Sequence, residues 1–130
     1  MQKSYRSILA AAASMLLANI AMAGAASAAT LSSGHLYAGG SNYHICVATN
    51  VGTKPIESVL VEVFDSLGDL VTSTTCSLLE PNTKCQAADN ATPGSGYANC
   101  RFTIDGSKKA VRASNSVCVL GSCSLILPAL

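Results

Sequence analysis

The sequence ICVATNVGTKPIESVLVEVFDSLGDLV, residues 45–71, decides the fold of this chain. Its central part, VLVEVF at residues 59–64, has valine at every second position, which is the two-residue period of a β-strand. The run ICVAT at residues 45–49 predicts another short strand. The Asn, Gly and Pro residues between the two runs mark a loop that joins them.

The same stretch closes with a turn, DSLGD at residues 65–69. Gly68 accepts a positive φ at little cost, and the Asp side chains can bond to nearby backbone groups. The turn leads to a further strand at residues 70–75. We therefore expect three neighbouring strands that follow one another as a meander.

The first residues have the pattern of a secretory signal peptide. Lys3 and Arg6 precede an uncharged run that continues to residue 29, and Ala-Ser-Ala at residues 26–28 suits a signal peptidase. We expect residues 1–28 to be removed and residues 29–130 to form one secreted or periplasmic domain. The run is also long enough to span a bilayer, so a membrane anchor is the competing interpretation.

The charge of the mature part argues against a nucleic-acid partner. Residues 29–130 keep six of the eight basic residues and all seven acidic ones, which gives a net charge near minus one. A nucleic-acid binder needs a basic excess that replaces condensed counterions. We expect a protein or an envelope component as partner, no nucleic acid, and no membrane span in the mature chain.

An even number of cysteines in an exported domain predicts disulfides. Cys76 and Cys85 flank Pro81-Asn82, which suits the centre of a turn. Cys118 and Cys123 enclose four residues that can also form a turn. These two local pairs leave Cys46 with Cys100, although six cysteines allow 15 pairings and spacing alone does not fix the connectivity.

The second half of the chain contains another alternating strand at residues 100–105. Cys100, Phe102 and Ile104 share one face, as expected of a half-buried strand. Asp105-Gly106 then predicts a turn, and residues 109–114 a returning strand. The tail at residues 117–127 predicts a terminal hairpin or edge segment, with a strand offered to a partner as the alternative.

Short strands at regular turn spacing favour a small antiparallel β-sandwich, and an immunoglobulin-like Greek key fits best. A Cys46–Cys100 bridge would then join the two sheets. Two features differ from a true immunoglobulin domain: the chain has no Trp, and Tyr97 precedes Cys100 by three residues instead of two. An inward Cys46 also sends the apolar Ile45 and Val47 outward.

Four short motifs resemble a known class of protein. They are Cys46-x-x-x-Asn50-x-Gly52, Phe64-Asp65-x-x-Gly68, Cys76-x-Leu78-x-x-Pro81-x-x-x-Cys85 and Tyr97-x-x-Cys100-Arg101. Together they are similar to small exported single-domain bacterial proteins of unknown function. The pair Cys118 and Cys123 lies outside the pattern. The resemblance implies export and a β-rich fold, and it implies no activity.

Few residues are suited to catalysis. A nucleophile needs an activating base and a group that orients the base, and His35 and His44 are the only histidines. No Gly-x-Ser-x-Gly motif places a serine for either of them. A zinc site of His44 with Cys46 would need a thiolate that an oxidising compartment converts to a disulfide. We therefore predict no catalytic centre, no cofactor and no metal site.

Charged residues give further candidates that have simpler explanations. Carboxylates for glycoside hydrolysis could come from Glu62, Asp65, Asp69 and Asp105, but turn chemistry explains Asp65 and Asp69 better. An anion patch could be formed by Lys108, Lys109 and Arg112, with Arg101 as a further candidate, although a solvated strand face also explains them. Asn90-Ala91-Thr92 matches a glycosylation sequon.

Two functions stay open. The favoured one is an exported, non-catalytic β-sandwich with a binding or structural role at the cell envelope or outside the cell. The alternative is a small secreted hydrolase, or a hydrolase inhibitor, acting from loops; it requires a histidine within hydrogen-bond reach of a serine or carboxylate. Candidate partner surfaces are the loops at 50–57 and 88–96, Tyr97, and the tail residues Leu125, Ile126 and Leu127. Tyr97 could instead pack in the core beside Cys100.

Overall fold

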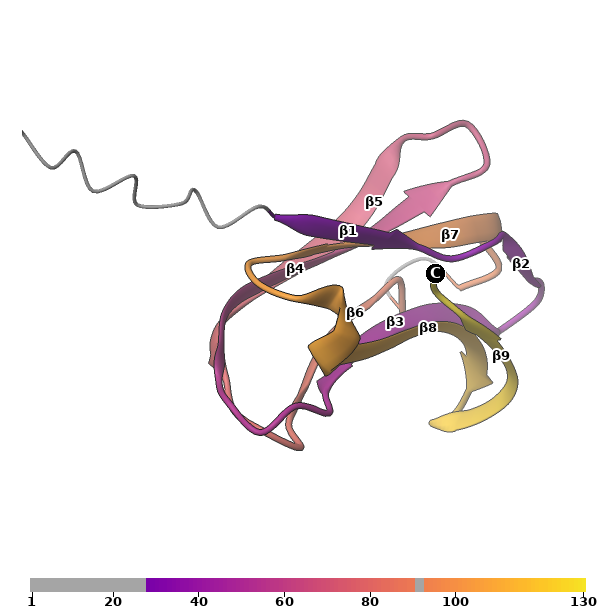
Figure 1. Ribbon diagram of the computed structural model, residues 1–130. Helices are drawn as coiled ribbons and strands as arrows, with labels where there is room; N and C mark the ends of the chain where they lie inside the picture. Colours follow the sequence, from indigo (N-terminus) through magenta and orange to yellow (C-terminus); the bar gives the residue numbers. More distant parts are fainter. Residues whose placement is uncertain (1–27, 91–92) are drawn as a thin grey trace, which may run out of the picture.

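The computed structural model describes residues 28–90 and 93–130. Residues 1–27 of the expected leader, and Ala91 and Thr92 of the sequon, lie outside this part of the chain. The described part folds into two β-sheets that face each other (Figure 1). Its elements are β1 (Ala29–Ser32), β2 (Leu36–Ala38), β3 (Tyr43–Asn50), β4 (Ile56–Asp65), β5 (Leu70–Leu79), β6 (Lys84–Ala88), β7 (Gly96–Ile104), the 3₁₀-helix η1 (Lys108–Ala110), β8 (Val111–Val119) and β9 (Ser122–Pro128).

Every strand pair in the two sheets is antiparallel. Sheet 1 has the order β1-β7-β4-β5, with β2 also paired to β7, and sheet 2 has the order β6-β3-β8-β9. The predicted antiparallel β-sandwich is confirmed. Its strands form where the sequence alternates, because one face of each sheet packs on the shared core.

The central strands pair as in an immunoglobulin-like Greek key. If β3, β4, β6 and β7 correspond to strands B, C, E and F of that fold, then B pairs with E and C pairs with F. The outer strands differ. The last long strand, β8, pairs with β3 instead of β7, and the first strands, β1 and β2, pair with β7. The first and last strands have therefore exchanged sheets relative to an immunoglobulin domain.

Two connections differ from the sequence predictions. The meander is wrong at its first step, because β3 lies in sheet 2 and β4 in sheet 1; only β4 and β5 form a hairpin. The strand expected to return after Asp105-Gly106 also changes sheets, through η1, and pairs with β3. Alternation identifies which residues face the core, but strands from opposite sheets face the same core and show the same pattern.

The turn between β4 and β5 has the predicted chemistry. Oδ1 of Asp65 accepts hydrogen bonds from the N–H groups of Leu67 and Asp69, at 2.8 and 2.9 Å. Gly68 has a φ of 88°, which favours glycine at this position. The turn therefore fixes the register of the hairpin.

The core has a large part and a small part. The large part surrounds Phe102 and the fully buried valines Val59, Val61 and Val63. The small part consists of Leu36, Ala38 and Val117, with Leu127 packed against them.

The conflict at Cys46 is resolved by the environment of β3. Cys46 is fully buried, while Ile45 and Val47 are half-buried on the outer face of sheet 2. A central strand thus tolerates apolar side chains on both faces.

Three disulfides join the strands, with the predicted pairing. Cys46–Cys100 connects β3 to β7 across the two sheets, Cys76–Cys85 connects β5 to β6, and Cys118–Cys123 closes the β8–β9 hairpin. In the hairpin, Leu120 and Gly121 both have positive φ, as a two-residue turn of type I′ requires. Three bridges in a small β-protein fit an oxidising environment.

Candidate functional site

One end of the sandwich is organised by Asn50, the last residue of β3. Its side-chain amide donates to the backbone carbonyls of Lys54 and Leu79, at 2.9 and 2.8 Å, and its Oδ1 accepts the N–H of Gly52 at 2.9 Å. A Cβ atom on Gly52 would lie 3.0 Å from the Cβ of Ala110, so glycine lets this loop pack against η1. The Cys-x-x-x-Asn-x-Gly motif is therefore explained by loop structure.

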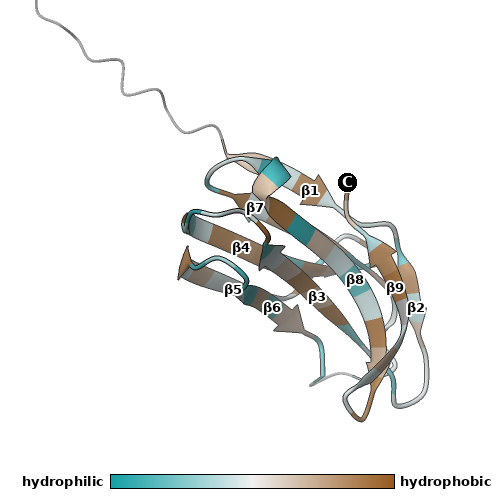
Figure 2. Cartoon of the chain, turned by 60° about the horizontal axis from the view of Figure 1, so that its bottom comes forward, coloured by the Kyte–Doolittle hydropathy of each residue, from teal (hydrophilic) through white to brown (hydrophobic). Residues whose placement is uncertain are grey.

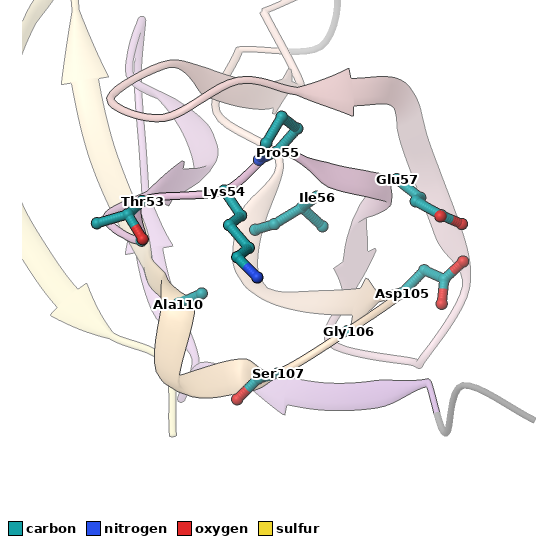
Figure 3. Close-up of a pocket in the computed structure, with 10 residues that line it drawn as sticks. Thr53, Lys54, Pro55, Ile56, Glu57, Asp105, Gly106, Ser107 and Ala110 are labelled. Atoms are coloured by element: carbon teal, nitrogen blue, oxygen red, sulfur yellow. The ribbon is translucent and has the colours of Figure 1, made fainter. Parts of the chain in front are cut away.

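This end of the sandwich carries a pocket of about 530 Å³ between the loop at 50–57 and the segment at 105–110 (Figure 3). The Lys54 side chain extends into the pocket, and the carboxylates of Glu57 and Asp105 lie beside each other at its margin (Figure 3). The predicted loop surface at 50–57 is thus one wall of a pocket whose lining is mostly apolar, with charged side chains at its margin. Its charges are of both signs and mostly exposed, so water and salt screen them.

The two histidines occupy different environments. His35 is exposed in the connection between β1 and β2. His44 is fully buried, and its Nε2 lies 3.1 Å from the carbonyl oxygen of Gly96. Within the described ranges, the Nδ1 atom of His44 has no hydrogen-bond partner. The structure therefore does not place either imidazole against a serine or a carboxylate in a cleft.

The loop at 88–96, a predicted partner surface, is held by a buried carboxylate. Asp89 accepts hydrogen bonds from the backbone N–H of His44 and from the Ser95 hydroxyl, the latter at 2.6 Å. Gly94 packs against the Gly40 turn, where a Cβ atom would lie 2.6 Å from the Gly40 carbonyl oxygen. These contacts explain the Gly and Asp residues of the loop as structural.

The predicted anion patch forms only in part. Lys108, Lys109 and Arg112 gather around a groove of about 500 Å³ beside the C-terminal residues. Arg101, the fourth candidate, lies on β7 in the outer face of sheet 1 and pairs with Glu62 instead. The three cations are exposed, as expected of a solvated surface.

The outer face of sheet 1 carries an exposed pair of aromatic residues. Tyr37 on β2 and Tyr97 on β7 are directly opposite each other, and their ring centroids are 5.0 Å apart. They are 58% and 55% exposed, so the alternative of a core-packed Tyr97 is wrong. The ring of Tyr37 lies over Gly39, where a Cβ atom would approach it to 2.9 Å. Glycine at this position leaves room for the ring.

A cation continues this surface along the sheet. The Arg101 guanidinium lies 4.4 Å from the ring centroid of Phe64 on β4, and it forms two hydrogen bonds with the Glu62 carboxylate, at 2.8 and 3.0 Å. The hydrogen bonds to Glu62 raise the pKa of Arg101 above its ordinary value. We name Tyr37, Phe64, Tyr97 and Arg101 the aromatic face.

The aromatic face was only partly predicted from the sequence. Tyr97 was expected, whereas Tyr37 and Phe64 were missed as site residues. Phe64 occupies an outward position in the alternating strand that buries Val63, and this alternation is the signal that could have identified it. The pairing of Tyr37 with Tyr97 joins two distant segments and has no local signal.

The predicted tail surface does not form one patch with Tyr97. Ile126 on β9 is 63% exposed, whereas Leu127 packs against the small core cluster. Leu125 lies opposite Val117 in the β8–β9 ladder, and its side chain is outside the described part of the structure. The tail belongs to sheet 2 and Tyr97 to the outer face of sheet 1, so they are separate surfaces.

The alternative zinc site at His44 and Cys46 lacks its thiolate. Cys46 is bonded to Cys100, and among residues 28–90 and 93–130 no group of three or more His, Cys, Asp or Glu side chains could hold a metal ion. In the same ranges, no helix is long and apolar enough to cross a membrane.

Comparisons with known proteins add no functional assignment. No family model and no curated protein matches the chain. Among solved structures, a crystal structure of FlgD from P. aeruginosa is similar, with 12% sequence identity, a TM-score of 0.32, and coverage of 79% of this chain and 72% of that chain. At that TM-score the likeness carries no argument about this protein.

Proposed function

We propose that this chain is an exported, non-catalytic β-sandwich protein that binds a protein or another envelope component through its aromatic face. It acts in the periplasm or outside the cell. The observation that carries the proposal is the concentration of aromatic side chains on one outer surface. Tyr37, Phe64 and Tyr97 are three of the five aromatic residues of the described chain, and only Phe102 lies fully in the core.

Exposed aromatic side chains that lie together on one surface are typical of binding sites, whereas single exposed apolar residues are common on any protein. Tyr, Trp and Arg dominate the energetics of protein interfaces because they combine a large apolar area with a polar group. The aromatic face has this composition. Glu62 and Phe64 hold Arg101 in position, so the guanidinium loses little freedom on binding.

The scaffold and its compartment support the same function. Cys46–Cys100 ties β7, which bears Tyr97 and Arg101, to the opposite sheet. A rigid sheet presents side chains for recognition at a small entropic cost. The disulfides suit an oxidising compartment, and the signal-peptide pattern and the resemblance to small exported bacterial proteins point to the same location.

The proposal is tested by photo-crosslinking in cells that produce and export the full chain. A photoreactive phenylalanine analogue replaces Tyr97 in one variant and Leu120, which is 99% exposed at the β8–β9 turn, in a matched control. We expect a discrete adduct from position 97 that excess unlabelled mature chain suppresses. Competitor chain carrying Tyr37→Ala with Tyr97→Ala should suppress it much less.

Two outcomes contradict the proposal. Equal adducts from positions 97 and 120 would show that the aromatic face has no special role, as would equal competition by the Tyr37→Ala, Tyr97→Ala chain. Purified mature protein should also show no turnover of esterase, glycosidase or protease substrates. Turnover that is lost in His35→Ala, with the fold unchanged, would favour the hydrolase alternative instead.

A further inference from the structure

β5 is a long and unusually unprotected edge strand. It is the last strand of sheet 1 and lies at one margin of the sandwich together with β6 (Figure 2). Within the described ranges its strand ladder is with β4 alone, so no strand pairs with its other edge. On that margin Cys76 is bonded to Cys85 of β6, and the Leu79 carbonyl accepts a hydrogen bond from Asn50. Its sequence, LVTSTTCSLL, has no charged residue and no proline, the two commonest devices that block pairing at an edge.

The other edges of the two sheets are shorter or blocked. Ser32, at the end of the four-residue strand β1, exchanges two backbone hydrogen bonds with Leu130. β6 has five residues and begins with Lys84, and β9 ends at Pro128. The β4–β5 ladder shifts register at Val63/Phe64, opposite the first residues of β5, and Leu78 has a positive φ of 52°, so the regular part of β5 runs from Thr72 to Ser77.

The exposed side chains of β5 match one another when two copies of the strand pair antiparallel, with Ser73 and Thr75 on one face and Leu70 and Leu78 on the other. Leu70 and Leu78 are 53% and 59% exposed and lie four residues on either side of Thr74. If two β5 strands pair antiparallel about an axis through Thr74, Leu70 of each chain lies opposite Leu78 of the other. Ser73 then lies opposite Thr75, and hydroxyl pairs of this kind are favourable across strands.

We propose that the β5 edge pairs antiparallel with β5 of a second copy of this chain, about a two-fold axis at Thr74. Identical strands pair isologously, so each contact occurs twice. The strand carries no charge, so like charges do not oppose each other within it. Asp69 and Glu80, which flank the strand, lie opposite Leu79 and Gly68 of the second copy in this register.

The paired edges would make one continuous sheet from two copies of sheet 1. With the axis perpendicular to the sheet, the two aromatic faces lie on the same side, and a partner that contacts both would be held bivalently. The pairing itself does not depend on the proposed function. An interface made mainly by one strand is small, so weak self-association is expected.

The test is sedimentation equilibrium of the mature disulfide-bonded chain over a concentration series. Ser73→Lys with Thr75→Lys sets like charges opposite each other and should raise the dimer dissociation constant at least tenfold. Ser73→Lys with Thr75→Glu sets opposite charges against each other, so the dimer should persist at low salt and weaken as salt is added. Both positions are exposed, and circular dichroism checks the fold of each variant.

The control variant is Gln86→Lys, which adds one charge at an exposed position of the β6 edge and should leave the dissociation constant unchanged. A chain that stays monomeric up to about 1 mM would overturn the proposal, because a dissociation constant above that concentration does not describe a stable dimer. A dimer that both β5 variants leave unchanged would also overturn it, because its interface would lie elsewhere.

Discussion

The two ends of the interior each contain a fully buried asparagine, yet they are built differently. Asn50, at the end with the large apolar cluster, satisfies both its amide nitrogen and its oxygen with three backbone bonds of 2.9 Å or less. Asn115, at the end with the small cluster, donates to the Ala98 carbonyl at 3.1 Å and to the Gly34 carbonyl at 3.5 Å. Its Oδ1 has no partner among the described residues.

The difference indicates where the fold is held most firmly. The large cluster combines wide apolar burial with a satisfied polar network and the Cys46–Cys100 bridge. The small cluster has four apolar members and the buried His44 beside it. Local opening free energies follow burial and hydrogen bonding, so the β8–β9 end should open before the Asn50 end.

The largest expected effect comes from the bridge in the large cluster. Cys46→Ala with Cys100→Ala should lower the free energy of unfolding by about 4 kcal/mol, because that bridge closes a long loop in the unfolded chain. Cys118→Ala with Cys123→Ala, which opens a short loop, should lower it by about 2 kcal/mol. Urea unfolding of both double variants measures the difference.

Equal decreases in the free energy of unfolding of these two double variants would contradict the proposed difference between the two ends. They would mean that the unfolded chain keeps structure around residues 46–100, so that the long bridge restricts it little. The Cys76→Ala, Cys85→Ala variant serves as an intermediate case, with an expected loss between the other two.

The next largest loss of stability is expected when the two buried asparagines are replaced. Asn50→Ala should cost about 3 kcal/mol, because it leaves the buried Leu79 carbonyl, and the partly buried Lys54 carbonyl and Gly52 N–H, without their partner. Asn115→Ala should cost about 1 kcal/mol, because it removes one good hydrogen bond and one long one. Thermal and urea unfolding of the two variants under the same conditions makes the comparison, with the half-exposed Asn99→Ala as a control near zero.

A larger loss for Asn115→Ala than for Asn50→Ala would show that the small cluster is the more critical end. Native-state hydrogen exchange would then also have to show slower exchange in β8 and β9 than in β4 and β7.

The sequence predicted the elements of the fold better than their arrangement. Alternation at Val59, Val61 and Val63 identified a strand and its buried face, because both follow from a local period. Local turn spacing also led to the disulfide pairing that the structure contains. Alternation does not say which sheet a strand joins, so the expected meander failed at the crossing from β3 to β4.

The candidate site was less predictable because it depends on pairing between distant segments. Tyr37 and Tyr97 meet only through the β2–β7 register, and Arg101 finds Glu62 through the β4–β7 register. Sequence spacing grouped Arg101 with Lys108, Lys109 and Arg112, which lie elsewhere. The tail residues, a separate candidate surface, belong to the other sheet.

The smallest effect is expected at the ion pair on the outer face of sheet 1, between the two ends. Glu62 is 8% exposed, whereas the side chain of Arg101 is 48% exposed, so Glu62 is the more deeply buried partner. Glu62→Gln leaves an exposed guanidinium that water can solvate and should cost less than about 1 kcal/mol. Arg101→Gln leaves a buried carboxylate without its cation and should cost more than Glu62→Gln does.

This asymmetry tests whether the burial of the partner that is left behind sets the cost of a lost polar contact outside the core. Urea unfolding of both single variants, with the exposed Glu57→Gln as a control near zero, gives the two costs. High salt should reduce the cost of Glu62→Gln more than that of Arg101→Gln, because salt screens exposed charges and not buried ones. Equal costs for the two variants would mean that the pair behaves as a fully exposed ion pair. In that case Arg101 would be held over Phe64 by its contact with the ring and not by Glu62.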